Sequence, residues 1–158
     1  MMQNPVNRAS SPLSLIVERT FPAAREKVFR AWIDPALMLK WFAPVGMTPF
    51  GIEADARVGG NYRIGMRERD GSTVFVTGTY LEVTPPTRLV FTWAWKSDPG
   101  DSSVVTVEFI DRQNATHIVL THARIIDPAH VDSHRYGWEG CLDHLLAAVS
   151  DSDSKLTA

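Results

Sequence analysis

The chain has 158 residues, a net charge of −2 and no long run of charge of one sign. A domain of this length buries about 70% of its unfolded-chain surface, so it needs no disulfide or metal to fold. This even distribution of charge argues against nucleic acid as the main partner, because proteins that bind nucleic acid concentrate basic residues on one face. One cysteine, no apolar signal segment and no long apolar stretch predict a cytoplasmic protein without a membrane span.

A single domain is predicted over residues 12–150. Residues 1–11 are polar and include Pro5, which indicates a flexible N-terminal arm. Residues 151–158 are also polar and are expected to form a C-terminal tail. No internal repeat or low-complexity linker divides the chain between them.

In chain order, the predicted elements are one strand, two short helices, six strands and one long helix. The first strand is predicted over 13–20 and the first helix over 23–33. Asp34 caps a second helix, which begins at Pro35 and runs through Trp41. The remaining strands are marked by alternating apolar residues between turns, over 50–54, 61–69, 72–83, 88–96, 104–111 and 116–125.

Short turns join these strands, and Asp70-Gly71 is expected to form a two-residue hairpin turn. Consecutive strands with short connections indicate an antiparallel sheet, and the helices at both ends of the sequence indicate the α+β class. Strand 13–20 or strand 104–111 is expected at a sheet edge. Pairing of such an edge with a second copy would give a homodimer.

The final helix begins after Asp127 or Asp132 and has one apolar face. At about 100° per residue, four of its residues fall on that face: Trp138, Leu142, Leu145 and Val149. An apolar helix face that follows a run of antiparallel strands favours a sheet curled around the helix. That arrangement often leaves a hollow, and a hollow suggests a ligand.

The ordered motifs resemble a known superfamily. The segment FPAAREKVFRAW (21–32) with Asp34-Pro35 resembles the opening of the START/Bet v 1-like (SRPBCC) superfamily. RVGGNYR (57–63), GTYLEV (78–83) and the Gly137-Trp138 helix are similar to one branch of it, the Hsp-90 ATPase activator-like proteins. The resemblance covers roughly residues 13–149, and its strength lies in the order of the motifs.

This resemblance implies a helix-grip fold, in which a curved antiparallel sheet wraps the long C-terminal helix and two short helices close one end. It also implies a cavity between sheet and helix, which binds apolar ligands in many relatives. The family takes its name from one domain of a eukaryotic co-chaperone, so a chaperone partner is a second expectation. Some members of the superfamily are cyclases, which makes a small cyclase or hydrolase a third.

We expect the cavity to bind a small apolar or aromatic molecule. The candidate ligand-binding residues are the inward-facing aromatic and apolar side chains with two histidines: Trp41, Phe42, Tyr62, Met66, Tyr80, Phe91, Trp93, Trp95, His122, His134, Trp138 and Leu142. His122 and Tyr80 are the candidate polar groups for orienting a ligand. The alternative is a completely filled core, which would favour the chaperone-associated interpretation.

No catalytic residue is assigned, because no spacing requires catalysis; His122, Tyr80 and Glu82 would be the groups available to a cyclase. No cofactor and no metal are expected. His130 and His134 have the spacing to share an ion, but a zinc site needs a third ligand from elsewhere. Cys141 is expected to be inert packing. The segment 43–49 is either a flap over the cavity mouth or a structured connector.

Overall fold

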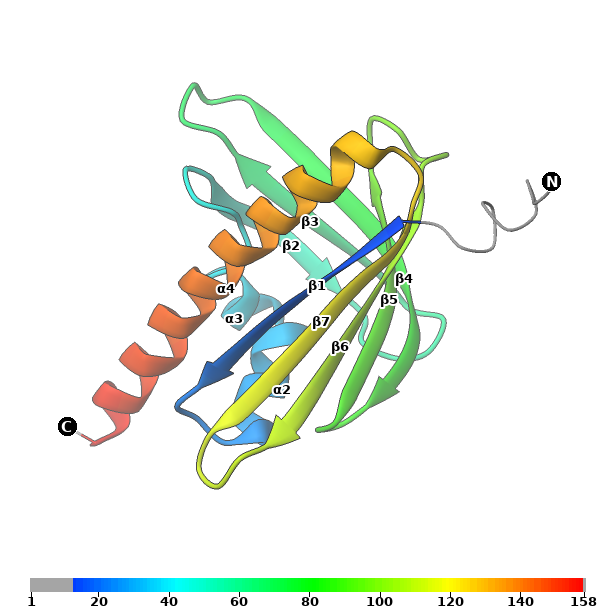
Figure 1. The fold of residues 1–158 in the computed structure, drawn as a ribbon. Coiled ribbons are helices and arrows are strands. Elements are labelled where there is room, and N and C mark those ends of the chain that lie inside the picture. The colour runs from blue at the N-terminus through cyan, green and yellow to red at the C-terminus, as the bar shows by residue number, and fades with distance from the viewer. Residues whose placement is uncertain (1–12, 158) are drawn as a thin grey trace, which may run out of the picture.

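The computed structural model describes residues 13–157, with side chains described through Ser150 (Figure 1). The elements in chain order are β1 (Leu13–Phe21), α2 (Arg25–Ile33), α3 (Pro35–Met38), β2 (Thr48–Ala54), β3 (Asn61–Arg67), β4 (Thr73–Thr84), β5 (Arg88–Trp95), β6 (Ser103–Asp111), β7 (Thr116–Ile125) and α4 (Pro128–Thr157). The predicted arm at 1–11 lies outside the described residues. The backbone of the predicted tail is helical through Thr157.

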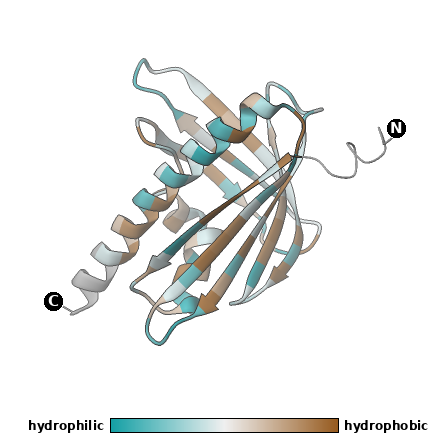
Figure 2. Cartoon of the chain, viewed as in Figure 1, coloured by the Kyte–Doolittle hydropathy of each residue, from teal (hydrophilic) through white to brown (hydrophobic). Residues whose placement is uncertain are grey.

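The strands form one antiparallel sheet in the order β1-β7-β6-β5-β4-β3-β2. The sheet is curved, and α4 lies across its open side with α2 and α3 at one end, as Figure 1 shows. The predicted helix-grip architecture is therefore confirmed. Apolar residues alternate along the strands and line one side of α4 in Figure 2, and this inner layer is the core. Within the described residues, no helix is long and apolar enough to cross a membrane.

The sheet edges differ in part from the prediction. In the described chain β1 and β2 are the outer strands, whereas β6 lies between β5 and β7. The prediction that 104–111 is an edge was wrong, because β6 pairs with strands on both sides. On β1, Arg135 Nη1 from α4 donates to the Ile16 carbonyl at 3.1 Å. Pairing of two copies through β1 stays a prediction.

The second helix ends earlier than predicted. Asp34 caps α3 as expected, since its carboxylate accepts a hydrogen bond from the Ala36 amide at 3.0 Å. The helix ends at Met38 rather than at Trp41. Trp41 is buried instead, and its indole Nε1 donates to the Ala31 carbonyl of α2 at 3.0 Å. This tertiary contact turns the chain inward where helix periodicity alone would continue.

The β3–β4 hairpin has a longer turn than predicted. Glu68 N donates to Ser72 O at 2.8 Å, so three residues form the loop, and Gly71 has φ of +91°. This is the pattern of a type I turn that ends in a left-handed residue. The Asp70 carboxylate accepts from both N and Oγ of Ser72, which lowers the pKa of Asp70. That local capping favours the longer loop.

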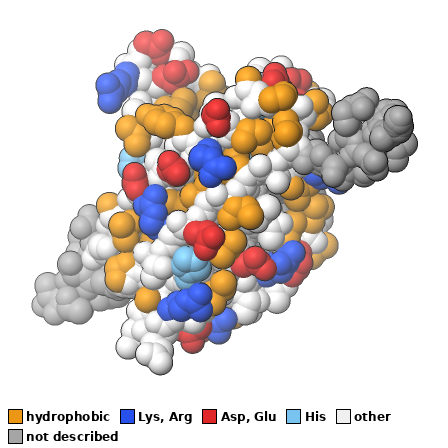
Figure 3. Space-filling view, viewed as in Figure 1, with side chains coloured by type: hydrophobic (Ala, Val, Ile, Leu, Met, Phe, Trp, Pro, Cys, Tyr) orange, Lys and Arg blue, Asp and Glu red, His pale blue; other side chains and the backbone are white. Residues whose placement is uncertain are grey.

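The long helix begins at Pro128, and the Asp127 carboxylate caps it by accepting from the Ala129 amide at 3.0 Å. Of the two predicted starts, Asp127 is therefore correct. The predicted apolar face is confirmed, because Trp138, Leu142, Leu145 and Val149 are all buried. On the face shown in Figure 3, charged side chains of both signs are interspersed with apolar ones.

Tyr62 and Gly78 mark a place where the sheet departs from regular pairing. The Tyr62 hydroxyl donates to the Thr92 carbonyl at 2.6 Å, from β3 across β4 to β5. A Cβ atom on Gly78 would lie 2.0 Å from that carbonyl oxygen and 2.5 Å from the Tyr62 ring. Only glycine therefore allows the tyrosine to cross β4, and the crossing fills this part of the interior with aromatic rings.

Candidate functional site

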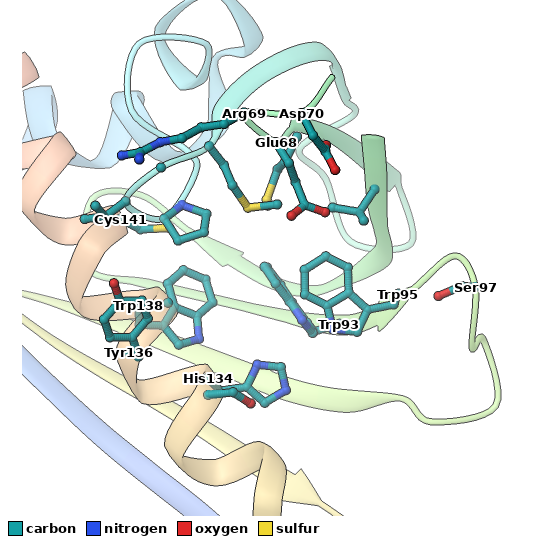
Figure 4. A pocket seen from close by; sticks show the side chains of 18 residues that line it. Glu68, Arg69, Asp70, Trp93, Trp95, Ser97, His134, Tyr136, Trp138 and Cys141 are labelled. Carbon is teal, nitrogen blue, oxygen red and sulfur yellow. The ribbon is translucent and has the colours of Figure 1, made fainter. Parts of the chain in front are cut away.

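A cavity of about 690 Å³ opens between β3, β5, the β3–β4 hairpin and α4 (Figure 4). Trp93 and Trp95 of β5 project into it because they alternate on the inner face of one strand. Trp138 of α4 and Met66 of β3 supply further wall. Figure 4 shows the three indoles on the side of the hollow that faces the Glu68 and Arg69 side chains.

The predicted ligand-binding residues fall into three groups. Five of them line the cavity: Met66, Trp93, Trp95, His134 and Trp138. Four surround a separate void of about 10 Å³, too small for a ligand: Phe42, Tyr62, Tyr80 and Phe91. Three are buried in the core and line neither space: Trp41, His122 and Leu142. The interior is therefore filled at one end and hollow at the other, and a ligand role for all twelve stays a prediction.

The cavity wall is built from indoles that meet at steep angles. Trp93 and Trp95 contact edge to face, with ring centroids 5.9 Å apart and planes at 81°. Trp93 and Trp138 lie 5.0 Å apart at 52°. Phe42 packs on both Trp93 and Trp138 from the core side and closes the inner end. Contacts of this kind add to the stability of the wall beyond the apolar area they bury.

His122 is held by hydrogen bonds on both ring nitrogens. The Trp138 indole Nε1 donates to His122 Nδ1 at 2.9 Å, and an indole nitrogen can only donate. Nδ1 is therefore unprotonated, and the Nε2–H of the neutral ring donates to Ser103 Oγ at 2.6 Å. Ser103 Oγ in turn donates to the Trp93 carbonyl at 3.3 Å. This series of hydrogen bonds connects Trp93 to Trp138 and leaves His122 no free nitrogen for a ligand.

The histidines beside the cavity are electrostatically disfavoured as cations. Burial lowers the pKa of His122 to about 3, and the nearby His134 ring, 4.3 Å away, adds to the effect. The pKa of His134 is also lowered, first by burial and then by His130, while Asp101 acts in the opposite direction. Near pH 7 the imidazole on the cavity wall, His134, is therefore neutral.

The cavity rim consists of residues that the sequence prediction did not select. Glu68, Arg69 and Asp70 form it on the hairpin tip, and Val45 and Tyr136 form it on the opposite side. Tyr136 is 66% exposed and Val45 50% exposed. The sequence does not predict this rim, because its residues are far apart in the chain and only the tertiary structure brings the hairpin close to α4. The predicted flap at 43–49 was the one signal, because Pro44, Val45, Gly46 and Met47 belong to the lining.

The segment after α3 is seated on α4. A Cβ atom on Gly140 would lie 2.8 Å from Val45 N, so this glycine lets the segment approach closely. His144 Nδ1 donates to the Ala43 carbonyl at 2.7 Å, one helical turn further along. These contacts describe a structured connector, and its role as a moving flap stays a prediction.

Cys141 lies on the cavity wall beside this segment, and burial raises the pKa of its thiol well above the usual range. It is therefore a protonated, weakly reactive side chain. Within residues 13–150, no group of three or more His, Cys, Asp or Glu side chains is arranged to hold a metal ion.

The family of the chain follows from comparison with known sequences. The family described as "Activator of Hsp90 ATPase homolog 1-like protein" matches residues 22–150, which is most of the chain. The chain belongs to this family. The resemblance inferred from the motifs is confirmed, and the family is part of the SRPBCC superfamily. No curated protein matches the sequence.

Solved structures of several bacterial proteins share the fold of this Activator of Hsp90 ATPase homolog 1-like chain. The AHSA1 protein of Silicibacter pomeroyi is 28% identical, with a TM-score of 0.80 over 89% of this chain and 99% of that one. A protein from Chromobacterium violaceum is also 28% identical, with a TM-score of 0.78 over 85% and 94%. An AHSA1-like protein from Aeromonas hydrophila is 26% identical, with a TM-score of 0.75 over 89% and 94%.

Proposed function

We propose that the protein binds a small apolar or aromatic molecule in the cavity between the sheet and α4. The observation that carries this proposal is a hollow of about 690 Å³ walled by Trp93, Trp95 and Trp138. Ligand pockets are typically about 300–1,000 Å³ and mostly apolar, with a few polar groups that set orientation. His134 and the hairpin tip supply such groups here.

The arrangement favours binding over catalysis in this proposal. His122 was the candidate acid or base for a cyclase, but both of its nitrogens are hydrogen-bonded inside the protein. Tyr80 surrounds the small void rather than the cavity, and burial raises its pKa to about 12. The proposed role of the cavity therefore needs no catalytic group and no cofactor.

Gly137 offers a direct test, because it lines the cavity and a Cβ atom there would meet nothing within 4 Å. We expect Gly137→Leu to fill part of the cavity without disturbing the fold and to weaken binding at least tenfold. The matched control is Ala147→Leu, at an exposed position of the same helix, which should bind as wild type does. The assay is a thermal-shift screen of apolar and aromatic compounds, followed by calorimetric titration of the hits.

Native mass spectrometry of protein purified from a bacterial host provides an independent readout. We expect a co-purified apolar molecule on the wild type and on Ala147→Leu, and none on Gly137→Leu. Equal occupancy of all three proteins would place the ligand elsewhere and contradict the proposal. A wild type with no bound molecule and no thermal shift would also contradict it.

A second candidate function is association with an Hsp90-type chaperone, which the family description suggests. A basic and aromatic cluster on the outer face of β2–β4 favours it. Arg63 lies 4.2 Å from the Phe75 ring centroid and Arg67 lies 4.6 Å from that of Phe50. Stacking of this kind presents guanidinium groups on a rigid aromatic base, which suits an acidic protein surface.

The chaperone candidate is tested by calorimetry and by ATPase measurements with a purified Hsp90 chaperone. If it is correct, wild type binds and changes the ATPase rate, and the Arg63→Glu/Arg67→Glu double variant loses both effects. Gly137→Leu should leave both effects unchanged, because the cluster and the cavity are on opposite faces of the sheet. No binding by the wild type would eliminate this candidate.

A further inference from the structure

We propose that the cavity selects ligands that carry a cationic amine next to an apolar or aromatic body. This inference rests on the proposed function, because it specifies the ligand class for the same cavity. It follows from three features of the lining: the orientation of the indole rings, the placement of one carboxylate, and the position and charge of the nearby basic groups.

The indole rings form a corner that suits a cation. The planes of Trp93 and Trp95 meet at 81°, so the edge of one ring points at the face of the other. The two rings therefore form the two sides of a corner. Trp138, at 52° to Trp93, and the exposed Tyr136 bring two more rings to the same lining. Aromatic faces carry negative potential and attract cations within about 6 Å of the centroid, and several rings together form an ammonium cage.

Glu68 supplies a carboxylate above this corner. Figure 4 shows its side chain directed from the hairpin toward Trp93 and Trp95. Within the described residues, the only hydrogen bond to the Glu68 carboxylate is a long one, from Ser72 Oγ to Oε2 at 3.3 Å. Asp70, the other carboxylate of the lining, accepts from Ser72 N at 2.9 Å and Ser72 Oγ at 2.6 Å. Both Ser72 bonds reach Asp70 Oδ1, so each carboxylate keeps acceptor capacity, but the Glu68 side chain is the one directed toward the indole corner.

The basic side chains of the lining, Arg69 and His134, do not neutralise the negative charge of Glu68 at the indole corner. Arg69 extends along the opposite side of the cavity in Figure 4, above Cys141, with its Nε 3.7 Å from where a Cβ atom on Gly46 would lie. His134 is neutral near pH 7, because burial lowers its pKa. The lining thus carries two carboxylates against one guanidinium that faces the 43–47 segment. A cationic head between Glu68 and the indoles fits this charge pattern, whereas an anionic head would meet carboxylate and ring faces.

The test uses three probes with one apolar body and different charge: 1-naphthylmethylamine, 1-naphthalenemethanol and 1-naphthoate. Calorimetric titration of the wild type should give at least tenfold tighter binding of the amine than of the alcohol, with the carboxylate weakest. Glu68→Gln should reduce the amine affinity about tenfold and leave the alcohol unchanged. Asp70→Asn is the matched control on the same loop and should have a smaller effect on the amine.

The outcomes separate this inference from the proposed function. Equal affinities for amine and alcohol, or tightest binding of the carboxylate, would overturn amine selectivity while the cavity remained a ligand site. Unchanged amine affinity in Glu68→Gln, with unaltered thermal stability, would overturn the role of Glu68 and with it this inference. If every probe still binds Gly137→Leu as it binds the wild type, the inference and the proposed function both fail. They also fail if no probe binds the wild type.

Discussion

His122 is a buried imidazole that the fold keeps neutral, and this has a measurable consequence for stability. Its pKa of about 3 lies below the ordinary 6.5, so between these values the unfolded chain binds a proton that the folded chain excludes. The free energy of unfolding therefore decreases as pH falls through this window. We expect a loss of about 2 kcal/mol from His122 between pH 7 and pH 5.

Urea unfolding of the wild type and His122→Gln at pH 7 and pH 5 measures this contribution. The variant should be less stable at pH 7 and should lose less stability on acidification. His117→Gln is the control, because His117 lies on the outer face of the same strand, where it contacts Glu18 and Thr20. If His122→Gln shows the wild-type pH dependence, or if the His122 ring titrates near 6.5 by NMR, the described hydrogen-bond chain is incorrect.

The alternation of apolar and polar residues along a strand predicts well which face of the sheet a side chain lies on. Trp93 and Trp95 were placed inward by period two, and both line the cavity. The polar partners of His122 were not predictable in this way. Trp138 and Ser103 lie 16 and 19 residues away, and they meet the imidazole only because β6, β7 and α4 pack in this register.

At the scale of an element, α4 contains two glycines in different surroundings. A Cβ atom on Gly137 would meet nothing, whereas one on Gly140 would lie 2.8 Å from Val45 N. Gly137→Ala should raise the free energy of unfolding by about 0.5–1 kcal/mol, the usual gain for alanine inside a helix. Gly140→Ala should lower it, because the backbone of the 43–47 segment must move.

Thermal and urea unfolding of the two alanine variants checks this pair. Gly140→Ala should also weaken ligand binding, since the displaced segment lines the cavity. An equal change in the free energy of unfolding for both variants would mean that the 43–47 segment does not pack closely on Gly140.

The sequence predicts an element boundary correctly where a local interaction such as a helix cap sets it. It does not predict a boundary that depends on a tertiary contact. The Asp34 and Asp127 caps and the strand at 116–125 agree with the sequence pattern. The end of α3 was missed because the Trp41 indole bonds to α2, an interaction without local signal. The position of β6 inside the sheet depends on strand order, which periodicity does not specify.

At the scale of the whole molecule, the fold followed from the order of elements and the family resemblance, whereas the division of the interior did not. Large inward apolar residues occur along both β3 and β5, so the sequence pattern alone indicates a core that is filled from end to end. The actual division depends on two glycines. Gly78 lets Tyr62 cross and fill the inner end. Gly137 contributes no side chain to the outer end, which stays hollow.

The most direct test of the account is an NMR titration that follows the indole N–H signals of all five tryptophans with an apolar aromatic ligand. Three tryptophans line the cavity, while Trp32 of α2 and Trp41, which follows α3, are buried against each other outside the cavity lining and serve as internal controls. We expect saturable shifts that are largest for Trp93, Trp95 and Trp138 and that vanish in Gly137→Leu. Shifts of equal size on all five, or none at saturating ligand, would contradict the claim that this cavity is a binding site.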